Sequence, residues 1–215
     1  MILQHLLLVY LVSYIIISIL ISVVAVVFAD KMVKLLGATP GLQSLASDYL
    51  RYYALFSIPN LVGVVLSSFA RNDNQPRLAM IATISGAITN IILDYVFIFK
   101  FGLGIKGAAI ATGLGQIATV VILLPHFIKK RGYLTFGKSK LEVSVIKELF
   151  NIGIPSFLCQ VSYSIIVLLH NIIITKTIGE IGVSAFSIIC YIGTNIYMVL
   201  FGLTLGSQPL ISYNY

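Results

Sequence analysis

Long apolar runs separated by short polar stretches dominate this chain. Five runs contain no formally charged residue and a sixth contains only Asp94; they cover residues 6–29, 52–70, 78–99, 107–128, 149–175 and 181–215. Each run has the roughly 17–20 residues that an α-helix needs to cross about 30 Å of hydrocarbon. The sequence does not alternate in polarity as the strands of a membrane barrel do. The pattern therefore predicts an all-α, polytopic membrane protein with six transmembrane helices.

The polar connections predict how the chain is organised. Short turns are expected at 31–45, 71–77, 100–106 and 176–180. The longest connection, residues 129–147, divides the chain into four helices in residues 1–128 and two helices in residues 148–215.

The second half of that longest connection has a helical pattern of its own. In the sequence LEVSVIKELF, apolar residues recur at Leu141, Val145, Leu149 and Phe150. This spacing predicts a short amphipathic helix on the membrane surface. Gly153 and Pro155 should then bend the chain into the fifth span.

Small residues and prolines inside the spans predict how the helices pack. Gly107, Ala111 and Gly115 recur every four residues, which favours close packing of the fourth span against another helix. Pro59 and Pro125 also fall inside spans. They are either tolerated kinks, because neighbouring helices re-satisfy the backbone, or points where a helix bends as the protein changes state.

Composition agrees with a membrane protein and bears on its orientation. The chain is 59% hydrophobic and 10% charged, against roughly 25% charged residues in an average soluble domain. Basic residues spread over the connections give a net charge of +7, which sets membrane orientation and does not indicate a nucleic-acid partner. Connections of one parity, including the cluster between Lys129 and Lys147, hold eight Lys or Arg residues, and the others hold six. We therefore expect a cell-membrane protein with its N-terminus and the long basic loop in the cytoplasm.

The sequence gives no indication of an enzyme. Gly102, Gly104 and Gly107 match the dinucleotide fingerprint G-x-G-x-x-G, which needs a preceding strand and an acidic residue about 20 positions later. The next acid here is Glu142, so the glycines predict a tight turn. His5, His126 and His170 are isolated and are expected to be structural or interfacial. Cys159 and Cys190 fall within predicted helices and are expected to be small buried hydrophobic residues. We expect no catalytic residue and no organic cofactor.

Asp94 is the most informative residue, because a carboxylate in a bilayer-spanning helix costs about 2.5–3.5 kcal/mol. Asn90 precedes it by four positions and shares its helix face. Asp94 and Thr112 lie nine residues before and after Leu103, the centre of the turn, so a hairpin places them at matching depth. Their oxygens suit a small hard cation such as sodium, and a buried carboxyl also suits a proton. The alternative is an aspartate that snorkels to the outer surface or caps the turn.

Other polar residues at span depth are candidates for a solute pathway: Gln116, Gln160 and Asn195. Each is equally suited to bonding between helices, worth about 0.6–2 kcal/mol.

A family resemblance rests on the run SIPNLVGVVLSSFARNDNQPRLAMIATISGAITNIILDYVFIFKFGLGIKGAAIAT. It resembles the multidrug and toxic compound extrusion (MATE) transporters. The shared pattern is a polar R-x-x-x-x-P-R/x-x-A-M loop, a span ending N-x-x-x-D-Y/P, and a G-x-G-x-x-G-A-A-x-A-T turn and helix. The block Gly153-Ile-Pro155 and the terminal GSQPLISYNY resemble the family's seventh and eighth helices.

In this family twelve helices form two six-helix lobes around a central cavity that opens alternately to each side. The resemblance implies that this chain corresponds to helices three to eight, with residues 129–147 as the inter-lobe loop. We therefore expect a fragment, from a truncated reading frame or an incomplete gene model.

The resemblance also implies roles for residues. Members with a coupling site in the N-terminal lobe take an Asn and an Asp from the fifth helix and a Thr from the sixth, matching Asn90, Asp94 and Thr112. The partner acid on the family's first helix is not in this chain. Some members carry an acid for sodium on the seventh helix, where this chain has Gln160 and no acid. Coupling through the C-terminal lobe is therefore not expected.

The function implied is that of a secondary antiporter that exports amphipathic, often cationic, organic compounds, driven by inward movement of protons or sodium. Its partners would be that substrate and membrane lipid, with no obligate protein partner. Two alternatives stay open. One is a lipid-linked glycan flippase of related architecture, against which the lack of Lys and Arg in the spans argues. The other is a six-helix remnant that inserts, or joins another subunit, without transporting.

Overall fold

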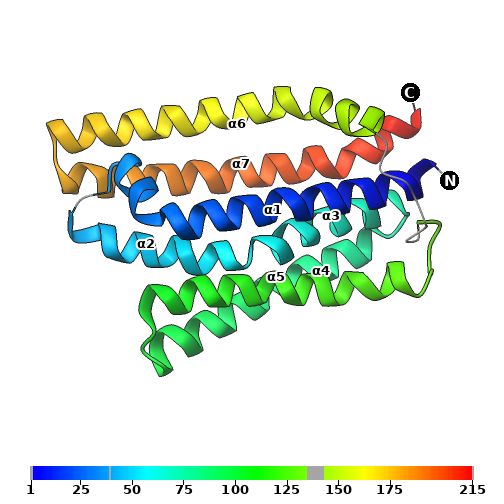
Figure 1. Ribbon diagram of the computed structural model, residues 1–215, viewed down its shortest axis with the longest axis horizontal. Helices are drawn as coiled ribbons and strands as arrows, with labels where there is room; N and C mark the ends of the chain where they lie inside the picture. The colour runs from blue at the N-terminus through cyan, green and yellow to red at the C-terminus, as the bar shows by residue number, and fades with distance from the viewer. Residues whose placement is uncertain (1, 39, 135–142, 215) are drawn as a thin grey trace. The chain divides into compact units, whose positions relative to one another are not determined.

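The computed structural model describes the backbone of residues 2–38, 40–134 and 143–214, and every element in these ranges is helical (Figure 1). In chain order they are α1 (Ile2–Leu35), α2 (Pro40–Leu55), α3 (Ser57–Asn72), α4 (Pro76–Asp94), the π-helix η1 (Tyr95–Lys100), α5 (Gly104–Ile128), α6 (Val143–Thr177) and α7 (Glu180–Asn214). The chain separates into two compact units, Met1–Asn151 and Ile152–Tyr215. The first contains α1 to α5, and the second contains most of α6 and all of α7.

The membrane class follows from the length and polarity of these helices. Among the described residues, five stretches are long and apolar enough to cross a bilayer: Leu7–Leu35, Pro76–Lys100, Gly104–Ile128, Phe150–Thr177 and Ile181–Thr204. A sixth crossing results if α2 and α3, whose axes differ in direction by 53°, form one bent span. The predicted all-α, multi-pass membrane class is confirmed.

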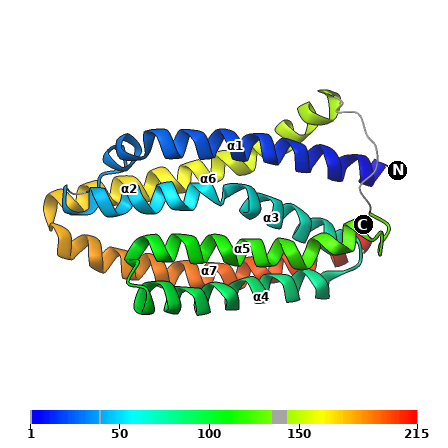
Figure 2. The ribbon, with the colours of Figure 1, turned by 60° about the horizontal axis from the view of Figure 1, so that its bottom comes forward.

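A bend between α2 and α3 interrupts the span expected at 52–70, close to Pro59, and Figure 2 shows the change of direction. The two helices meet at Phe56. Pro59 accounts for the break, because it has no N–H to donate to the Leu55 carbonyl and its ring clashes with that carbonyl in a straight helix. The backbone ladder restarts at the break, where the Asn60 N–H donates to the Phe56 carbonyl at 3.1 Å.

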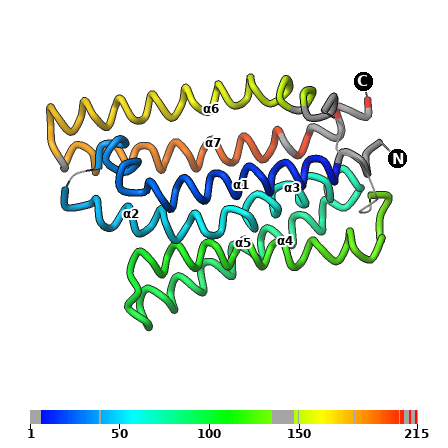
Figure 3. Tube along the Cα trace, viewed as in Figure 1, coloured from blue at the N-terminus to red at the C-terminus, as the bar shows by residue number. Residues whose placement is uncertain are grey.

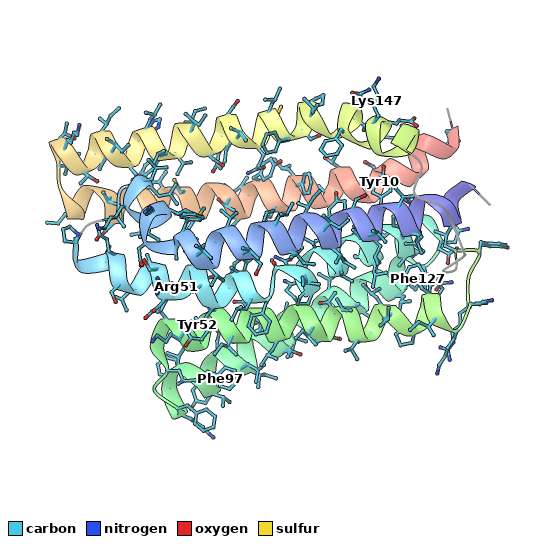
Figure 4. All side chains as sticks on the ribbon, viewed as in Figure 1. Tyr10, Arg51, Tyr52, Phe97, Phe127 and Lys147 are labelled. Carbon is cyan, nitrogen blue, oxygen red and sulfur yellow. The ribbon has the colours of Figure 1, made fainter. Side chains whose placement is uncertain are left out.

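Helices α1 and α2 also extend into the polar connection expected at 31–45, so the turn between them is shorter than the sequence suggested. The charges near this end of the unit pair between helices. Arg51 of α2, labelled in Figure 4, lies 2.6 Å from Asp30 of α1, and Lys106 of α5 lies 3.2 Å from Asp48 of α2. Two ion pairs between neighbouring helices therefore stabilise the charged ends of α1, α2 and α5 beyond the apolar runs.

The hairpin that joins α4 to α5 turns as predicted. Gly102 and Gly104 have φ angles of 65° and 55°, in the left-handed region that glycine adopts without a steric penalty. Figure 3 traces this turn to one end of the first unit, with the α3–α4 turn and the end of α5 at the other.

Part of the amphipathic surface helix expected before the fifth span lies outside the described residues, including Leu141 and the side chains of Val145 and Leu149. From Val143 the chain is one continuous helix, α6, with Pro155 inside it. A bend at this proline stays a prediction, as does the division of the chain at 129–147.

An apolar core joins α1, α3, α4 and α5 near the end of the unit where Figure 4 labels Tyr10 and Phe127. Leu66 of α3, Leu123 and Phe127 of α5, and Leu7 of α1 are almost fully buried there. Large apolar residues on the outer faces of the helices are exposed, as expected of surfaces that meet lipid.

Helices α4 and α5 run side by side and approach closely at glycines (Figures 1 and 2). A Cβ added at Gly86 would lie 2.7 Å from the Gly115 carbonyl oxygen and would overlap the Thr119 hydroxyl. The converse holds for Gly115, whose Cβ would lie 2.7 Å from the Gly86 carbonyl oxygen. The stripe predicted from Gly107, Ala111 and Gly115 thus lies in the packed interior, with Ala111 fully buried.

We expect Gly86→Ala to destabilise the first unit by about 1–3 kcal/mol, because the added methyl group forces the two backbones apart. Gly63→Ala on α3 is the matched control, since its Cβ would meet no atom closer than 3.6 Å. Thermal unfolding of both variants in the same detergent measures the difference. Equal midpoints for the two variants would contradict the close contact of α4 and α5.

A buried carboxylate joins the α3–α4 turn to the end of α5. The Asp73 side chain is 1% exposed, and its Oδ2 lies 2.7 Å from Nε2 of His126. Its Oδ1 accepts the backbone N–H groups of Tyr133 and Leu134 at 2.9 and 3.1 Å. His126, which stands apart from other titratable residues in the sequence, is therefore one partner of a structural cluster that anchors the chain after α5.

We expect Asp73→Ala to cost about 3 kcal/mol or more, because it leaves the buried imidazole and two backbone N–H groups, that of Leu134 buried and that of Tyr133 partly buried, without their acceptor. Asp30→Ala removes an exposed ion pair and should cost less than about 1 kcal/mol. Thermal unfolding compares the two, and similar losses would mean that Asp73 is not the anchor described here.

Candidate functional site

Asp94 lies where the α-helical part of the third span passes into a π-helix. It is the last residue of α4, and η1 follows directly with the Phe101 N–H bonded to the Val96 carbonyl five residues earlier. Such π segments are frequent at functional sites. The Asp94 side chain makes no hydrogen bond that caps η1. Its Oδ1 is buried and has no hydrogen-bond partner among the described residues.

Asn90 connects Asp94 with Thr112. Its side chain is a hydrogen-bonding neighbour of the Asp94 carboxyl. Its Nδ2 lies 3.4 Å from the Thr112 Oγ1, a long distance for a hydrogen bond. The Thr112 hydroxyl donates to the Ala108 carbonyl at 2.9 Å, so its oxygen is left as an acceptor. The structure thus brings Asn90 next to both other residues, and no hydrogen bond joins Asp94 directly to Thr112 among the described atoms.

This arrangement can hold a small cation or a proton. Asp94 supplies a carboxylate oxygen with unused acceptor capacity, and Asn90 and Thr112 add neutral oxygens nearby. Hard cations prefer oxygen ligands of these types. The described residues contain no group of three His, Cys, Asp or Glu side chains that could hold a metal ion, so the set does not indicate a transition metal. The coupling role of Asp94, Asn90 and Thr112 stays a prediction.

A cavity of about 440 Å³ lies between α3, α4 and α5, next to this cluster. Asn90 and Thr112 line it, and so does Gln116, one of the residues expected along a solute pathway. Asp94 is not among the lining residues. Asn90 therefore stands between the carboxylate and the cavity.

Several residues that line the cavity were not identified from the sequence: Asn60, Ser67, Arg71, Thr83 and Thr119. A signal for them exists. The small and polar lining residues of each helix follow helical spacing, as in Asn60, Gly63, Ser67 and Arg71 on α3. Three such stripes mark three faces that meet, but only packing shows that they face one another.

Gln160 and Asn195 belong to the second unit, which is described by itself. Both are exposed there, and the Asn195 Nδ2 donates to the Tyr191 carbonyl of its own helix at 2.8 Å. A pocket of about 210 Å³ between α6 and α7 is lined by neither residue, although Asn171 lines it. A pathway role for Gln160 and Asn195 stays a prediction.

We expect Asp94→Leu to raise the stability of the first unit by about 1 kcal/mol, because it removes a buried oxygen, Oδ1, that has no partner among the described residues. Asp48→Leu is the control and should not stabilise, since it removes the carboxylate that pairs with Lys106. Thermal unfolding measures both. Loss of stability in both variants would mean that the Asp94 Oδ1 has a partner in the folded protein.

Three comparisons place the chain among known proteins. The family model described as MatE matches residues 2–96. Multidrug export protein MepA of Staphylococcus aureus (strain bovine RF122 / ET3-1) is 28% identical over 200 residues, which cover 92% of this chain and 44% of MepA. MepA of Staphylococcus haemolyticus (strain JCSC1435) is 29% identical over 205 residues, 94% of this chain and 45% of that protein.

Solved structures of multidrug transporters are also similar to this chain. The MATE multidrug transporter DinF-BH, solved in complex with a small molecule, superposes with a TM-score of 0.86 at 28% identity, covering 95% of this chain and 46% of that one. The chain therefore spans a little under half the length of the relatives it matches.

Proposed function

Since this chain belongs to the MATE family over about 92% of its length, we propose that it serves multidrug efflux as a secondary antiporter. The proposed antiport couples inward movement of protons or sodium to export of amphipathic, often cationic, organic compounds. The observation that carries the coupling is the buried Asp94 Oδ1, which has no hydrogen-bond partner in the described part of the chain, on a carboxyl that Asn90 contacts. The names of the relatives support multidrug export, and the ion and substrate class are part of the proposal.

Coupling follows from the position of Asn90 between two acceptors. With Asp94 ionised, the Asn90 carboxamide divides its hydrogen bonds between that carboxylate and the Thr112 oxygen. A bound cation or proton neutralises Asp94 and makes it a poorer acceptor, which frees Asn90 to pair with Thr112. Because Asn90 and Thr112 line the cavity, occupation of Asp94 changes the cavity wall.

An ion acts on transport through the balance between conformations. A ligand shifts a two-state equilibrium only by its difference in affinity for the two states. In this proposal the state that holds Asn90 against Thr112 binds the ion more tightly, and the other state binds the solute. The close contact of Gly86 with Gly115 keeps α4 and α5 together as one body, so the change at Asn90 is carried by the unit as a whole.

We expect the 215-residue chain, reconstituted into lipid vesicles, to move a fluorescent organic cation when a proton gradient or a sodium gradient is imposed separately. Asp94→Asn should reduce this flux to background, because it keeps the shape of the side chain and removes its charge. Asp48→Asn, an acid outside the cluster, should retain the flux. Insertion of every variant is checked by the yield of folded protein in the vesicles.

The outcomes separate the candidate functions. Undiminished flux through Asp94→Asn removes that residue from the coupling. Movement of a lipid-linked sugar phosphate in place of the organic cation favours the flippase alternative. No flux under either gradient favours a non-transporting membrane protein.

A further inference from the structure

The cavity between α3, α4 and α5 contains one charge, and it is positive. Of the described residues that line it, Arg71 alone is charged, and none is acidic. Arg71 lies in the last turn of α3, just beyond the apolar run at 52–70. The runs themselves contain no Lys or Arg, but α3 continues past its run and brings Arg71 into the cavity wall.

The guanidinium of Arg71 has donors to spare. Its recorded partner is the Ser68 hydroxyl, 3.3 Å from Nη2. Among the described residues no carboxylate lies within ion-pair distance of Arg71; the acids of α1, α2 and the α3–α4 turn pair with other residues. A guanidinium presents five N–H groups in a fixed planar fork, which matches the two oxygens of a carboxylate or phosphate.

The remaining polar groups are neutral and can orient a ligand without balancing the charge. Hydroxyls and carboxamides come from all three helices: Asn60 and Ser67 of α3, Thr83 and Asn90 of α4, and Thr112, Gln116 and Thr119 of α5. The volume of about 440 Å³ falls within the range of small-molecule sites, roughly 300–1,000 Å³. A ligand that brings its own oxyanion would supply the one group that the wall lacks.

We propose that this cavity binds the anionic oxyacid group of an amphipathic ligand through Arg71. The substrates it prefers are then zwitterions, which carry a carboxylate or phosphate as well as a cationic or aromatic part, over purely cationic compounds. The preference among transported compounds rests on the proposed transport function, whereas binding at Arg71 can be measured without transport.

A second role for Arg71 is a cation at a helix C-terminus, where the partial negative charge of the helix end stabilises it. That role concerns α3 alone and predicts no effect on ligands. Arg77 provides the comparison, because it lies just beyond the same turn, is exposed, and does not line the cavity.

The test uses two dyes that differ by one ethyl group. Rhodamine 6G is a cationic ester, and its free acid carries the same cationic ring with a carboxylate. Their binding to the purified chain in phosphatidylcholine nanodiscs is followed by fluorescence anisotropy. We expect the acid to bind more tightly than the ester, and Arg71→Gln to weaken the acid by about tenfold or more while changing the ester by less than about twofold.

Two control variants complete the design. Arg71→Lys keeps the charge without the fork and should recover part of the lost affinity for the acid. Arg77→Gln should leave both dyes unchanged. Equal affinities of the two dyes for the wild-type chain, equal losses of both in Arg71→Gln, or no binding of the acid would each overturn the proposal.

The source of the oxyanion is resolved by lipid composition. Phosphatidylglycerol, an anionic lipid, then replaces part of the phosphatidylcholine. If it weakens binding of the acid to the wild-type chain but not to Arg71→Gln, a lipid headgroup is an occupant of the site. Absence of competition assigns the site to soluble organic anions. Binding of the acid through Arg71 without gradient-driven flux supports the anion site and removes the transport function, whereas flux with no dependence on Arg71 removes this inference alone.

Discussion

The close contact between α4 and α5 is the interaction on which the rest of the first unit depends. At Gly86 and Gly115 each glycine meets the carbonyl oxygen of the other, at a separation that leaves no room for a side chain. This approach lets the Thr119 hydroxyl reach the Ala82 carbonyl across the pair, at 3.3 Å. One turn further along, it sets Asn90 of α4 against Thr112 of α5. The ion cluster and one wall of the cavity therefore both follow from two residues without side chains.

Polar side chains in this unit differ in whether they can form a hydrogen bond within their own helix. Threonine hydroxyls inside a helix donate to the carbonyl four residues earlier, as Thr83, Thr89 and Thr112 do. Such a bond satisfies the hydroxyl hydrogen in a lipid environment and leaves the oxygen as an acceptor. An ionised carboxylate has no hydrogen to donate, so Asp94 cannot use its own helix in this way. It stays dependent on Asn90 and on whatever ion or proton it binds.

Charge at the two ends of the unit is handled differently from charge inside it. Asp73 is buried, but three N–H donors surround it, counting the His126 ring, and hold it in a fixed place. Asp30 and Asp48 pair with basic residues of neighbouring helices at the opposite end. Arg71 and Asp94 differ from these because the described structure supplies neither with an opposite charge. Unpaired charges at the edge of a membrane protein's interior are expected where function requires them.

The sequence by itself determined the helical class, the approximate spans and the α4–α5 turn, because runs of about 20 apolar residues and glycines in a turn act locally. From their distance to the turn it also predicted matching depth for Asp94 and Thr112, whereas the structure sets Asn90 against Thr112. The bend at Phe56 could also be predicted from the sequence, because a proline inside a helix lacks an N–H and clashes with the preceding turn. The apolar pattern, however, continues across Pro59. Only the tertiary structure decided that Arg71 lines a cavity and that Asp73 meets His126. These contacts join helices far apart in sequence, and their distance is set by side-chain packing that apolar patterning leaves unspecified.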